Sequence, residues 1–256
     1  MRMKKSDYLI FLNSININKP NDFYGNCGKC PFCDRKKLKG ILKEDGPFLL
    51  IENKYNTLKN TRQLIIVETY DCSMQMGDYS EEYMKKLMRF SIENWLELEK
   101  SEKYKSVIFY KNHGIRSGGS LKHPHMQIVG LHTIDYKENI KKENFDGISI
   151  FKSKFTTVNL STKPINGFCE FNIIMEDTLK SIDEFSCNIR KVVDYILNHY
   201  FAPCDSFNLF FYHYDKKVIC KVMPRFVTSP LVLGYKIKQI SDEIEEIAKK
   251  MKRLYF

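Results

Sequence analysis

The stretch Asn112–Gln127, NHGIRSGGSLKHPHMQ, lies between two apolar, strand-like segments and is the most specific pattern in the chain. Its run Ser117–Ser120 offers unhindered backbone N–H groups and two hydroxyls, which suit a phosphate or another oxyanion. His123 and His125 follow at alternate positions, so their side chains would point to one side of an extended strand. The pattern predicts an anion-binding turn beside two functional histidines. The alternative is a glycine-rich hairpin that leads into a strand with structural histidines.

The same stretch resembles the active-site segment of the galactose-1-phosphate uridylyltransferases, which belong to the histidine-triad (HIT) superfamily. Their signature is His-Pro-His-x-Gln, preceded by Asn-x-Gly and a Gly-Ser turn, and the chain has all three features. The resemblance implies that His125 is the nucleophile that takes up a nucleoside monophosphate. It also implies that His123 is a zinc ligand.

A cysteine-rich segment, Asn26–Cys33 (NCGKCPFC), contains two overlapping Cys-x-x-Cys pairs among turn-forming residues. Thiolates at this spacing can bind one zinc ion, which then needs two more ligands from elsewhere in the chain. A redox-active pair is the alternative, although no thioredoxin-like strand precedes the segment. The resemblance implies Cys30 and Cys33 as the ligands, with Cys27 as a spare or alternative ligand.

Asp71-Cys72 stands where the uridylyltransferases usually have Asp-His, with that histidine as a zinc ligand. The departure preserves the chemistry, because thiolate and imidazole are both good ligands for zinc. We therefore predict one zinc ion per chain at a Cys3His site. Four protein ligands leave no position open for water, so this zinc would be structural. The predicted ligands are Cys30, Cys33, Cys72 and His123.

The apolar run Pro47–Leu58 predicts a strand that ends near Asn53. The resemblance implies that Asn53 and Tyr55 hold the nucleoside, and for Tyr55 a place in the core is the alternative. The other residues predicted to bind nucleotide or phosphate are Asn112, Ser117, Gly118 and Gly119.

The order strand, helix, strand, strand occurs twice along the chain. The first copy is predicted at residues 64–69, 78–100, 106–111 and the histidine motif, with Asp78 and Glu81 as the start signal of its helix. The second copy is predicted at residues 170–176, a helix opened by a capping box at Ser181–Glu184, and strands at 207–214 and 218–223.

These elements predict an α+β fold of two fused HIT-like units, with antiparallel sheets and helices packed on one face. The expected units are residues 1–145, with the zinc loop and the active-site motif, and residues 146–256. In place of the histidine motif the second unit has Val218–Met223, so it would only complete the pocket, where Arg225 could reach phosphate. The amphipathic stretch Ser241–Leu254 predicts a helix that packs on its unit or, alternatively, forms a homodimer contact.

The chain of 256 residues is 43% hydrophobic, which is enough to bury a core in one large domain or two fused units. Its net charge of +10 comes from scattered lysines, which favours a solvated basic surface over nucleic-acid binding.

The apolar run Tyr8–Leu12 is too short for a secretion signal, and no stretch approaches the ~20 apolar residues of a membrane span. The eight cysteines fit a reduced compartment with metal ligation. We therefore expect a cytoplasmic protein without a membrane partner.

The expected chemistry is nucleophilic. A neutral imidazole is a competent nucleophile near neutral pH when a carbonyl holds its other nitrogen as N–H. We expect His125 to attack the α-phosphorus of a nucleoside diphosphate compound, while Ser120 and the backbone of Gly118 and Gly119 stabilise the nonbridging oxygens. Gln127 replaces the third histidine of the superfamily's hydrolases. Because an amide does not titrate, Gln127 favours transfer to a phosphate-bearing acceptor, or phosphorolysis, over hydrolysis.

The predicted protein is thus a nucleotidyltransferase whose partners are a nucleotide or nucleotide-sugar and a phosphate-bearing acceptor. One alternative is a phosphorylase or hydrolase of dinucleoside polyphosphates. The other is a nonenzymatic nucleotide-binding protein on the same scaffold. Lys54 and Arg116 differ from the commonest residues of the transferases, and the chain is shorter than most of them, so no galactose substrate is inferred.

Overall fold

A computed structural model of the chain describes residues 8–23, 30–176 and 178–256. The chain divides into two compact units. The first unit consists of Met1–Met74, Phe90–Lys111 and Ser120–Asn139. The second consists of Gln75–Arg89, Asn112–Gly119 and Ile140–Phe256. The expected boundary near residue 145 stays a prediction.

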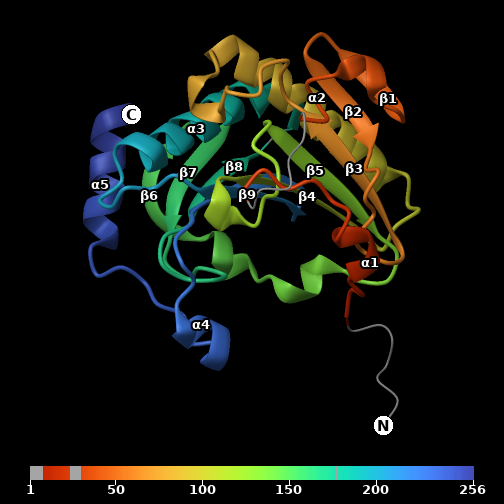
Figure 1. The fold of residues 1–256 in the computed structure, drawn as a ribbon. Helices are drawn as coiled ribbons and strands as arrows, with labels where there is room; N and C mark the ends of the chain where they lie inside the picture. The colour runs from red at the N-terminus through yellow and green to blue at the C-terminus, as the bar shows by residue number, and fades with distance from the viewer. Residues whose placement is uncertain (1–7, 24–29, 177) are drawn as a thin grey trace. The chain divides into compact units, whose positions relative to one another are not determined.

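The first half of the chain contains a hairpin, a third strand, a long helix and two further strands (Figure 1). Its strands lie side by side in the order β1-β2-β3-β5-β4, and every described pair is antiparallel. A short helix, α1 (Asn13–Asn16), precedes them. The elements are β1 (Ile41–Asp45), β2 (Phe48–Glu52), β3 (Thr61–Val67), α2 (Glu81–Lys100), β4 (Ser106–His113) and β5 (His125–Leu131).

The second half repeats this order of elements, and its strands lie in the equivalent order β6-β7-β8-β10-β9. Its described strand pairs are antiparallel as well. The predicted duplication is confirmed, and the structure adds β1 before the predicted strand at Pro47–Leu58 in the first copy and a hairpin at the start of the second. The elements are β6 (Gly147–Lys152), β7 (Thr156–Ser161), β8 (Phe171–Met175), α3 (Thr178–Asn198), β9 (Phe207–Tyr214) and β10 (Lys217–Pro224), followed by α4 (Pro230–Tyr235) and α5 (Ile244–Tyr255).

Strand register assigns side chains to the two faces of the first unit's strands, because directly paired residues share a face. Ile66 pairs with Met126, and both side chains are fully buried. On this face α2 contributes Trp95, whose ring lies 5.6 Å from that of Phe109 and whose Nε1 donates to the Val107 carbonyl at 3.0 Å. The opposite face carries the residues that alternate with these, including His125 and Gln127.

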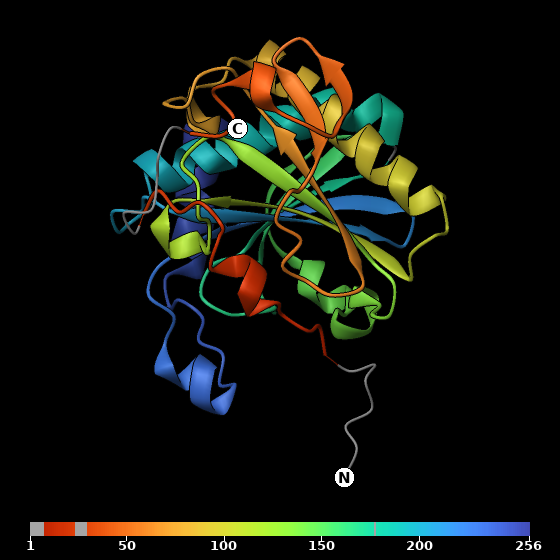
Figure 2. The ribbon, with the colours of Figure 1, turned by 45° about the vertical axis from the view of Figure 1, so that its right-hand side comes forward.

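Helix packing in the second unit follows the same plan. Helix α3 packs on β7, β8 and β10, and α5 packs on β6, β7 and α3. The amphipathic pattern correctly predicted α5, which buries Ile247, Ala248 and Met251. Figures 1 and 2 show α3 and α5 as continuous helices in cyan and dark blue. Within the described residues no helix is both long and apolar enough to cross a membrane.

Both predicted helix starts were wrong by about one turn. Helix α2 begins at Glu81, and the Ser80 hydroxyl accepts from the Tyr83 N–H at 3.2 Å, while Asp78 instead accepts from the Gln75 N–H in the preceding 3-10 turn. Helix α3 begins at Thr178, so Ser181 lies inside the helix and is fully buried rather than capping it. The sequence motif was present in both places, but neither motif marks the first residue of its helix.

Candidate metal centre and active site

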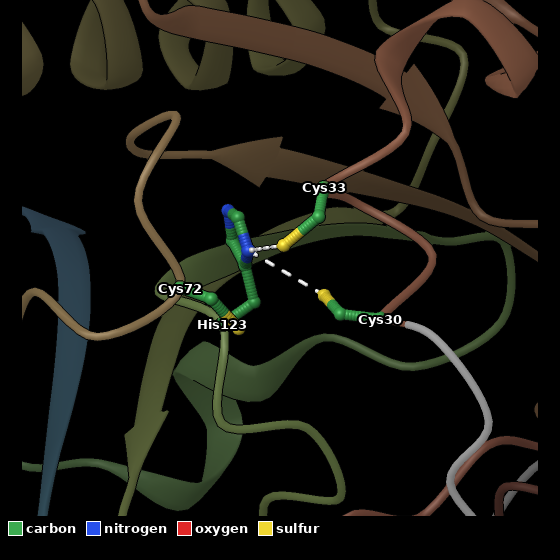
Figure 3. Close-up of side chains that lie close together, drawn as sticks. All are labelled: Cys30, Cys33, Cys72 and His123. Carbon is green, nitrogen blue, oxygen red and sulfur yellow. Dashed lines mark hydrogen bonds between the residues drawn. The ribbon is translucent and has the colours of Figure 1, made fainter.

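Four side chains from three separate segments of the sequence meet in the first unit (Figure 3). The ligand atoms of Cys30, Cys33, Cys72 and His123 all lie within 4.8 Å of one another. Atoms that bind one tetrahedral zinc ion are roughly 3.5 to 4 Å apart, so small side-chain movements would close this cluster around a metal. The predicted set of four ligands is therefore brought together, and it could hold a metal ion. Cys27 lies outside the described residues.

The orientation of His123 suits coordination through Nδ1. That nitrogen lies 3.5 Å from the Cys30 sulfur and 3.6 Å from the Cys33 sulfur. On the other side of the ring, Nε2 donates to the Thr69 carbonyl oxygen at 3.0 Å. A hydrogen bond of this kind fixes the tautomer of a metal-binding histidine and leaves the opposite nitrogen without a proton.

Arg35 supports the same carbonyl from a second direction. Its guanidinium donates to Thr69 O at 2.9 Å and to Pro47 O at 2.5 Å, and it stacks 3.9 Å from the centre of the Tyr70 ring. Arg35 follows the cysteine segment directly, so one side chain ties that segment to the loop that carries Cys72. Arg35 therefore helps to hold the loops that carry the cluster, and the sequence pattern did not reveal this role.

The chemistry of the donor set also fits a cation. Burial raises the pKa of the Cys72 thiol to about 12, and the neighbouring Cys30 and Cys33 sulfurs contribute to this shift. Three thiolates this close repel one another, and a divalent metal ion would replace their protons and remove that repulsion. A redox role is less well supported, because the sulfurs gather around an imidazole nitrogen.

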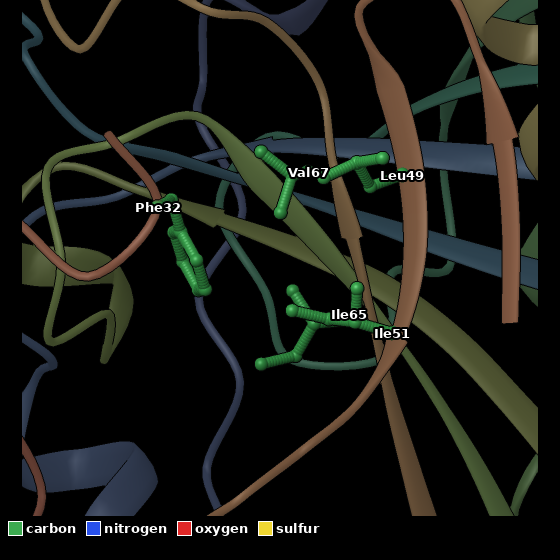
Figure 4. Packing of buried hydrophobic residues seen from close by; sticks show 5 residues of the cluster. All are labelled: Phe32, Leu49, Ile51, Ile65 and Val67. Carbon is green, nitrogen blue, oxygen red and sulfur yellow. The ribbon is translucent and has the colours of Figure 1, made fainter. Parts of the chain in front are cut away.

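Phe32 connects the cysteine segment to both histidines. Its ring centre lies 5.5 Å from that of His123 and 5.6 Å from that of His125. Figure 4 shows the hydrophobic cluster in which Phe32 is buried, on strands β2 and β3. The other members are Leu49, Ile51, Ile65 and Val67. Closing the metal cluster would thus fix an aromatic side chain against the predicted nucleophile.

His125 is the first residue of β5 and is 8% exposed. Its Nδ1 donates to the His123 carbonyl oxygen at 2.8 Å, which leaves Nε2 with its lone pair. Burial is the main cause that lowers the pKa of His125 to about 4. The bond to the His123 carbonyl opposes this shift, and the positive charges of Lys111 and Lys19 add to it. The ring is therefore neutral near pH 7, as a nucleophile requires.

Gln127 lies two residues along β5 and pairs with Tyr110 of β4. The Tyr110 hydroxyl donates to Oε1 of Gln127 at 3.2 Å. Burial raises the pKa of Tyr110 to about 12, so the phenol keeps its proton. This hydrogen bond occupies the amide oxygen and leaves the amide nitrogen as the donor. Tyr110 is a second supporting residue that the sequence pattern did not reveal.

Ser120 precedes the histidines, and the structure shows how its backbone is held. Its carbonyl oxygen accepts from the Asp22 N–H at 2.7 Å, and the Asp22 carboxylate accepts from the Lys122 N–H at 2.7 Å. Asp22 thus fixes the chain on both sides of Leu121. A catalytic role for the Ser120 hydroxyl stays a prediction.

Asn53 and Tyr55 adopt a local turn after β2. The Asn53 side-chain oxygen accepts from the Tyr55 N–H at 2.9 Å, and Asn53 is 7% exposed. An asparagine that bonds the backbone two residues ahead stabilises a turn by itself. The turn gives Asn53 a structural role, and binding of a nucleoside by either residue stays a prediction.

The predicted phosphate turn, Asn112–Gly119, belongs to the second unit, and its binding of phosphate stays a prediction. Within that unit Asn208 donates to the Asn112 side-chain oxygen at 2.7 Å and to the Ser117 carbonyl at 3.1 Å. The Ser117 hydroxyl donates to Gly114 O at 2.6 Å and accepts from the Gly119 N–H at 3.3 Å. Two of the N–H groups expected to bind phosphate, those of Ser117 and Gly119, are thus already engaged, since the Ser117 N–H donates to Gly114 O at 3.2 Å. Asn208 is a further missed residue.

Gly114 and Gly118 explain why this turn needs glycine. Both have positive φ angles, of 79° and 84°. A Cβ atom on Gly114 would lie 2.3 Å from the Ser206 hydroxyl, whereas one on Gly118 would meet nothing within 4 Å. Gly114 is therefore required for close packing, and Gly118 only for its left-handed backbone.

Comparison with known proteins places the chain in a family. Residues 11–134 match the N-terminal domain, and residues 137–256 the C-terminal domain, of a family described as a domain of unknown function, DUF4931. The crystal structure of a DUF4931 family protein from Bacillus cereus is 47% identical, with a TM-score of 0.77 over 83% of this chain and 98% of that chain. No curated protein matches the chain in sequence.

Two more distant structures share the fold. ADP-glucose phosphorylase from Arabidopsis thaliana, solved with bound ADP-glucose, is 15% identical, with a TM-score of 0.71 over 93% of each chain. A uridylyltransferase is also 15% identical, with a TM-score of 0.69 over 88% of this chain and 91% of that chain. The resemblance to uridylyltransferases of the HIT superfamily is thus confirmed for the fold. The chain belongs to the DUF4931 family and has the two-unit fold of the uridylyltransferases.

Proposed function

We propose that this protein is a nucleotidyltransferase that works through a covalent nucleotidyl-histidine at His125. The observation that carries the proposal is the hydrogen bond from Nδ1 of His125 to the His123 carbonyl, which presents Nε2 of a buried, neutral ring as the nucleophile. The fold shared with a uridylyltransferase and an ADP-glucose phosphorylase supports it.

In the first step Nε2 of His125 attacks the α-phosphorus of a nucleoside diphosphate compound. A bond forms between Nε2 and phosphorus, and the bond from phosphorus to the bridging oxygen breaks. The leaving phosphate or sugar phosphate takes that electron pair. The imidazole ring gains positive charge, which the His123 carbonyl oxygen stabilises through the Nδ1 proton.

In the second step an oxygen of a phosphate-bearing acceptor attacks the same phosphorus, and Nε2 leaves with its electron pair. No proton has to move, because phosphate oxygens are already ionised. The Gln127 amide nitrogen, left as a donor by Tyr110, would hydrogen-bond a nonbridging oxygen or the leaving group. Gln127 has no proton to give a poor leaving group, which is why phosphate acceptors are favoured over water.

Cys30, Cys33, Cys72 and His123 would hold one zinc ion, which when bound supplies a rigid four-ligand anchor and no open position for chemistry. The turn Asn112–Gly119 and Ser120 are proposed to bind the phosphates, and Asn53 and Tyr55 the nucleoside. The proposed role of the metal cluster is to position other residues. It holds His123, and through the His123 carbonyl it holds the ring of His125.

A second candidate, phosphorolysis, shares the first step and differs only in the acceptor, which would be inorganic phosphate. Gln127 is compatible with both. The protein would be incubated with UDP-glucose, ADP-glucose or diadenosine tetraphosphate, and each reaction divided among galactose 1-phosphate, inorganic phosphate and buffer alone. Product formed only when galactose 1-phosphate is added indicates transfer. Product formed only when inorganic phosphate is added indicates phosphorolysis, and product formed in buffer alone indicates hydrolysis.

The covalent step is tested separately with His125→Asn. This variant keeps a donor at the position of Nδ1 but has no nucleophilic nitrogen, so we expect adduct formation to fall by ~10³-fold or more with the metal content unchanged. The matched control is His213→Asn, on strand β9 of the second unit, which should form the adduct at the wild-type rate. An acid-labile adduct of undiminished yield in His125→Asn would rule out the mechanism.

A further inference from the structure

A buried ion pair lies behind the strand that carries His125. The Lys111 ammonium bonds to the Glu68 carboxylate, and the two side chains are 1% and 0% exposed. Lys111 comes from β4, one residue after Tyr110, and so belongs to the face of the strands that α2 covers. It therefore lies on the face opposite His125 and Gln127.

Both partners also contact the main chain around the predicted nucleophile. The Lys111 ammonium lies 3.5 Å from the His125 carbonyl oxygen, and the Glu68 backbone N–H donates to the Pro124 carbonyl at 3.1 Å. The His123 carbonyl accepts from the His125 ring. Three successive carbonyls, at positions 123 to 125, are thus each engaged.

Burying two charges is costly, and apolar side chains of similar volume often stabilise a protein as well or better. Such a pair calls for a reason beyond stability. The second unit holds another, Lys221–Glu170, at 2.8 Å with both side chains 0% exposed. There the reason is visible: Glu170 accepts from the backbone N–H groups of Ile165 and Asn166, and Lys221 donates to the Asn144 carbonyl. That pair fixes two loops.

We propose that the Lys111–Glu68 pair is a positioning device for His125, one that sets the main chain of the nucleophile from behind the strand without touching the substrate. The inference rests on the proposed function, because it assigns a purpose to the same histidine. In the second unit Tyr212 occupies the position equivalent to Lys111, since Phe211 is paired with Cys220 as Tyr110 is with Gln127. Tyr212 has no ammonium group, so among the described residues the second unit has no lysine at the position that backs its last strand.

The test compares two double variants that replace each pair by apolar residues. The double variant Lys111→Met with Glu68→Leu should fold, because neither charge is left alone. Its rate of adduct formation should nevertheless fall by ~10- to 100-fold, because the nucleophile would be displaced by up to about 1 Å. Its affinity for a nonreactive nucleotide analogue should change by less than ~3-fold. The control, Lys221→Met with Glu170→Leu, should react at the wild-type rate. Equal rates for the two double variants would overturn the inference.

A swapped pair, Glu68→Lys with Lys111→Glu, separates positioning from charge pairing. It keeps an ion pair but places a carboxylate beside the His125 carbonyl, so the adduct should form slowly. A wild-type rate would show that any buried pair suffices and would also overturn the inference.

Hydrogen exchange of the backbone amides at residues 125–127 gives a readout that does not depend on activity. Protection of these amides should fall by ~10-fold or more in the Lys111 and Glu68 double variant and stay unchanged in the control. If the wild-type protein formed no adduct, the proposed function would fail while this measurement still decided the positioning role. Unchanged protection would refute it.

Discussion

In the first unit His125 opens the last strand and pairs with Val67, whereas in the second unit Val218 occupies the equivalent place and pairs with Met175. The two units have the same elements in the same order, so the positions correspond. Val218 is 1% exposed and is simply part of the core. One topology therefore accommodates either a histidine or an apolar side chain at this position.

Two more positions differ in the same way. Gln127 pairs with Tyr110 in the first unit, and Cys220 pairs with Phe211 in the second. Cys220 and Phe211 are 0% and 2% exposed. The polar row of the first unit is thus apolar in the second, as expected from the absence of a histidine motif there. The comparison teaches that the fold tolerates these polar residues but does not need them.

Of the changes that test this comparison, removal of the proposed metal ligand Cys72 should have the largest effect. Cys72→Ser should lose most of the bound zinc and lower the melting temperature by ~10 °C or more, because free energy on the order of 10 kcal/mol from metal binding contributes to folding. Metal analysis and thermal unfolding would measure this. The control is Cys187→Ser on α3, which should keep both the zinc and the melting temperature. Zinc-free wild-type protein of full stability would contradict the metal assignment.

Truncating Phe32 should have the next largest effect. Phe32→Ala should destabilise the protein by about 3–5 kcal/mol, as for other buried aromatic residues, and should also weaken metal binding and adduct formation. Phe185→Ala in α3 should cost similar stability but leave the metal affinity unchanged, because Phe185 is fully buried in the other unit. Chemical denaturation and metal competition would measure both. Equal metal affinity in the two variants would show that Phe32 only fills space.

Tyr110→Phe gives the first unit the residue type that the second unit already has. Loss of one hydroxyl should cost about 1 kcal/mol and slow adduct formation by ~3- to 10-fold, because the Gln127 amide loses the bond that orients it. Single-turnover kinetics would measure the rate. Phe211→Tyr in the second unit serves as the control and should leave the rate unchanged. An unaffected rate in Tyr110→Phe would mean that the amide is oriented in another way.

The smallest effect is expected at Ser181, inside α3. Its buried hydroxyl has no hydrogen-bond partner among the described residues, so Ser181→Ala should stabilise the protein by ~0.5–1 kcal/mol. Ser186→Ala should destabilise it by a similar amount, since the Ser186 hydroxyl donates to the Ile182 carbonyl. Denaturant titration distinguishes the two. Destabilisation by Ser181→Ala would indicate a partner for its hydroxyl.

The sequence was sufficient for the central strands and long helices, because their apolar residues are strongly periodic. It did not reveal β1, whose residues Ile41–Asp45 are all exposed, β6, which is only partly buried, or β7, which is largely buried but has the mainly polar sequence TTVNLS. Strands without a buried face carry no alternating pattern, so only pairing with a neighbour defines them. The start of α3 was missed because the capping motif at Ser181–Glu184 lies inside the helix, where Ser181 is buried.

The four residues of the candidate metal cluster could be predicted because the resemblance to the uridylyltransferases implied Cys30, Cys33 and His123, and Cys72 stands where that family has a zinc-binding histidine. The supporting residues could not. Tyr110 reaches Gln127 only through strand register, and Lys111 meets Glu68 across 43 positions of sequence. Neither tyrosine nor lysine is unusual in a strand or near a turn. Their roles follow from which strands are neighbours, and a single sequence does not specify that order.

The most direct test of the central claim is tandem mass spectrometry of peptides from protein that has been incubated with a nucleotide panel and quenched at alkaline pH. We predict a mass increase of one nucleoside monophosphate on the peptide that contains His125, with fragment ions that place it on that ring. A nucleotide adduct on any other residue, or turnover of the nucleotide without an adduct, would contradict the proposed role of His125.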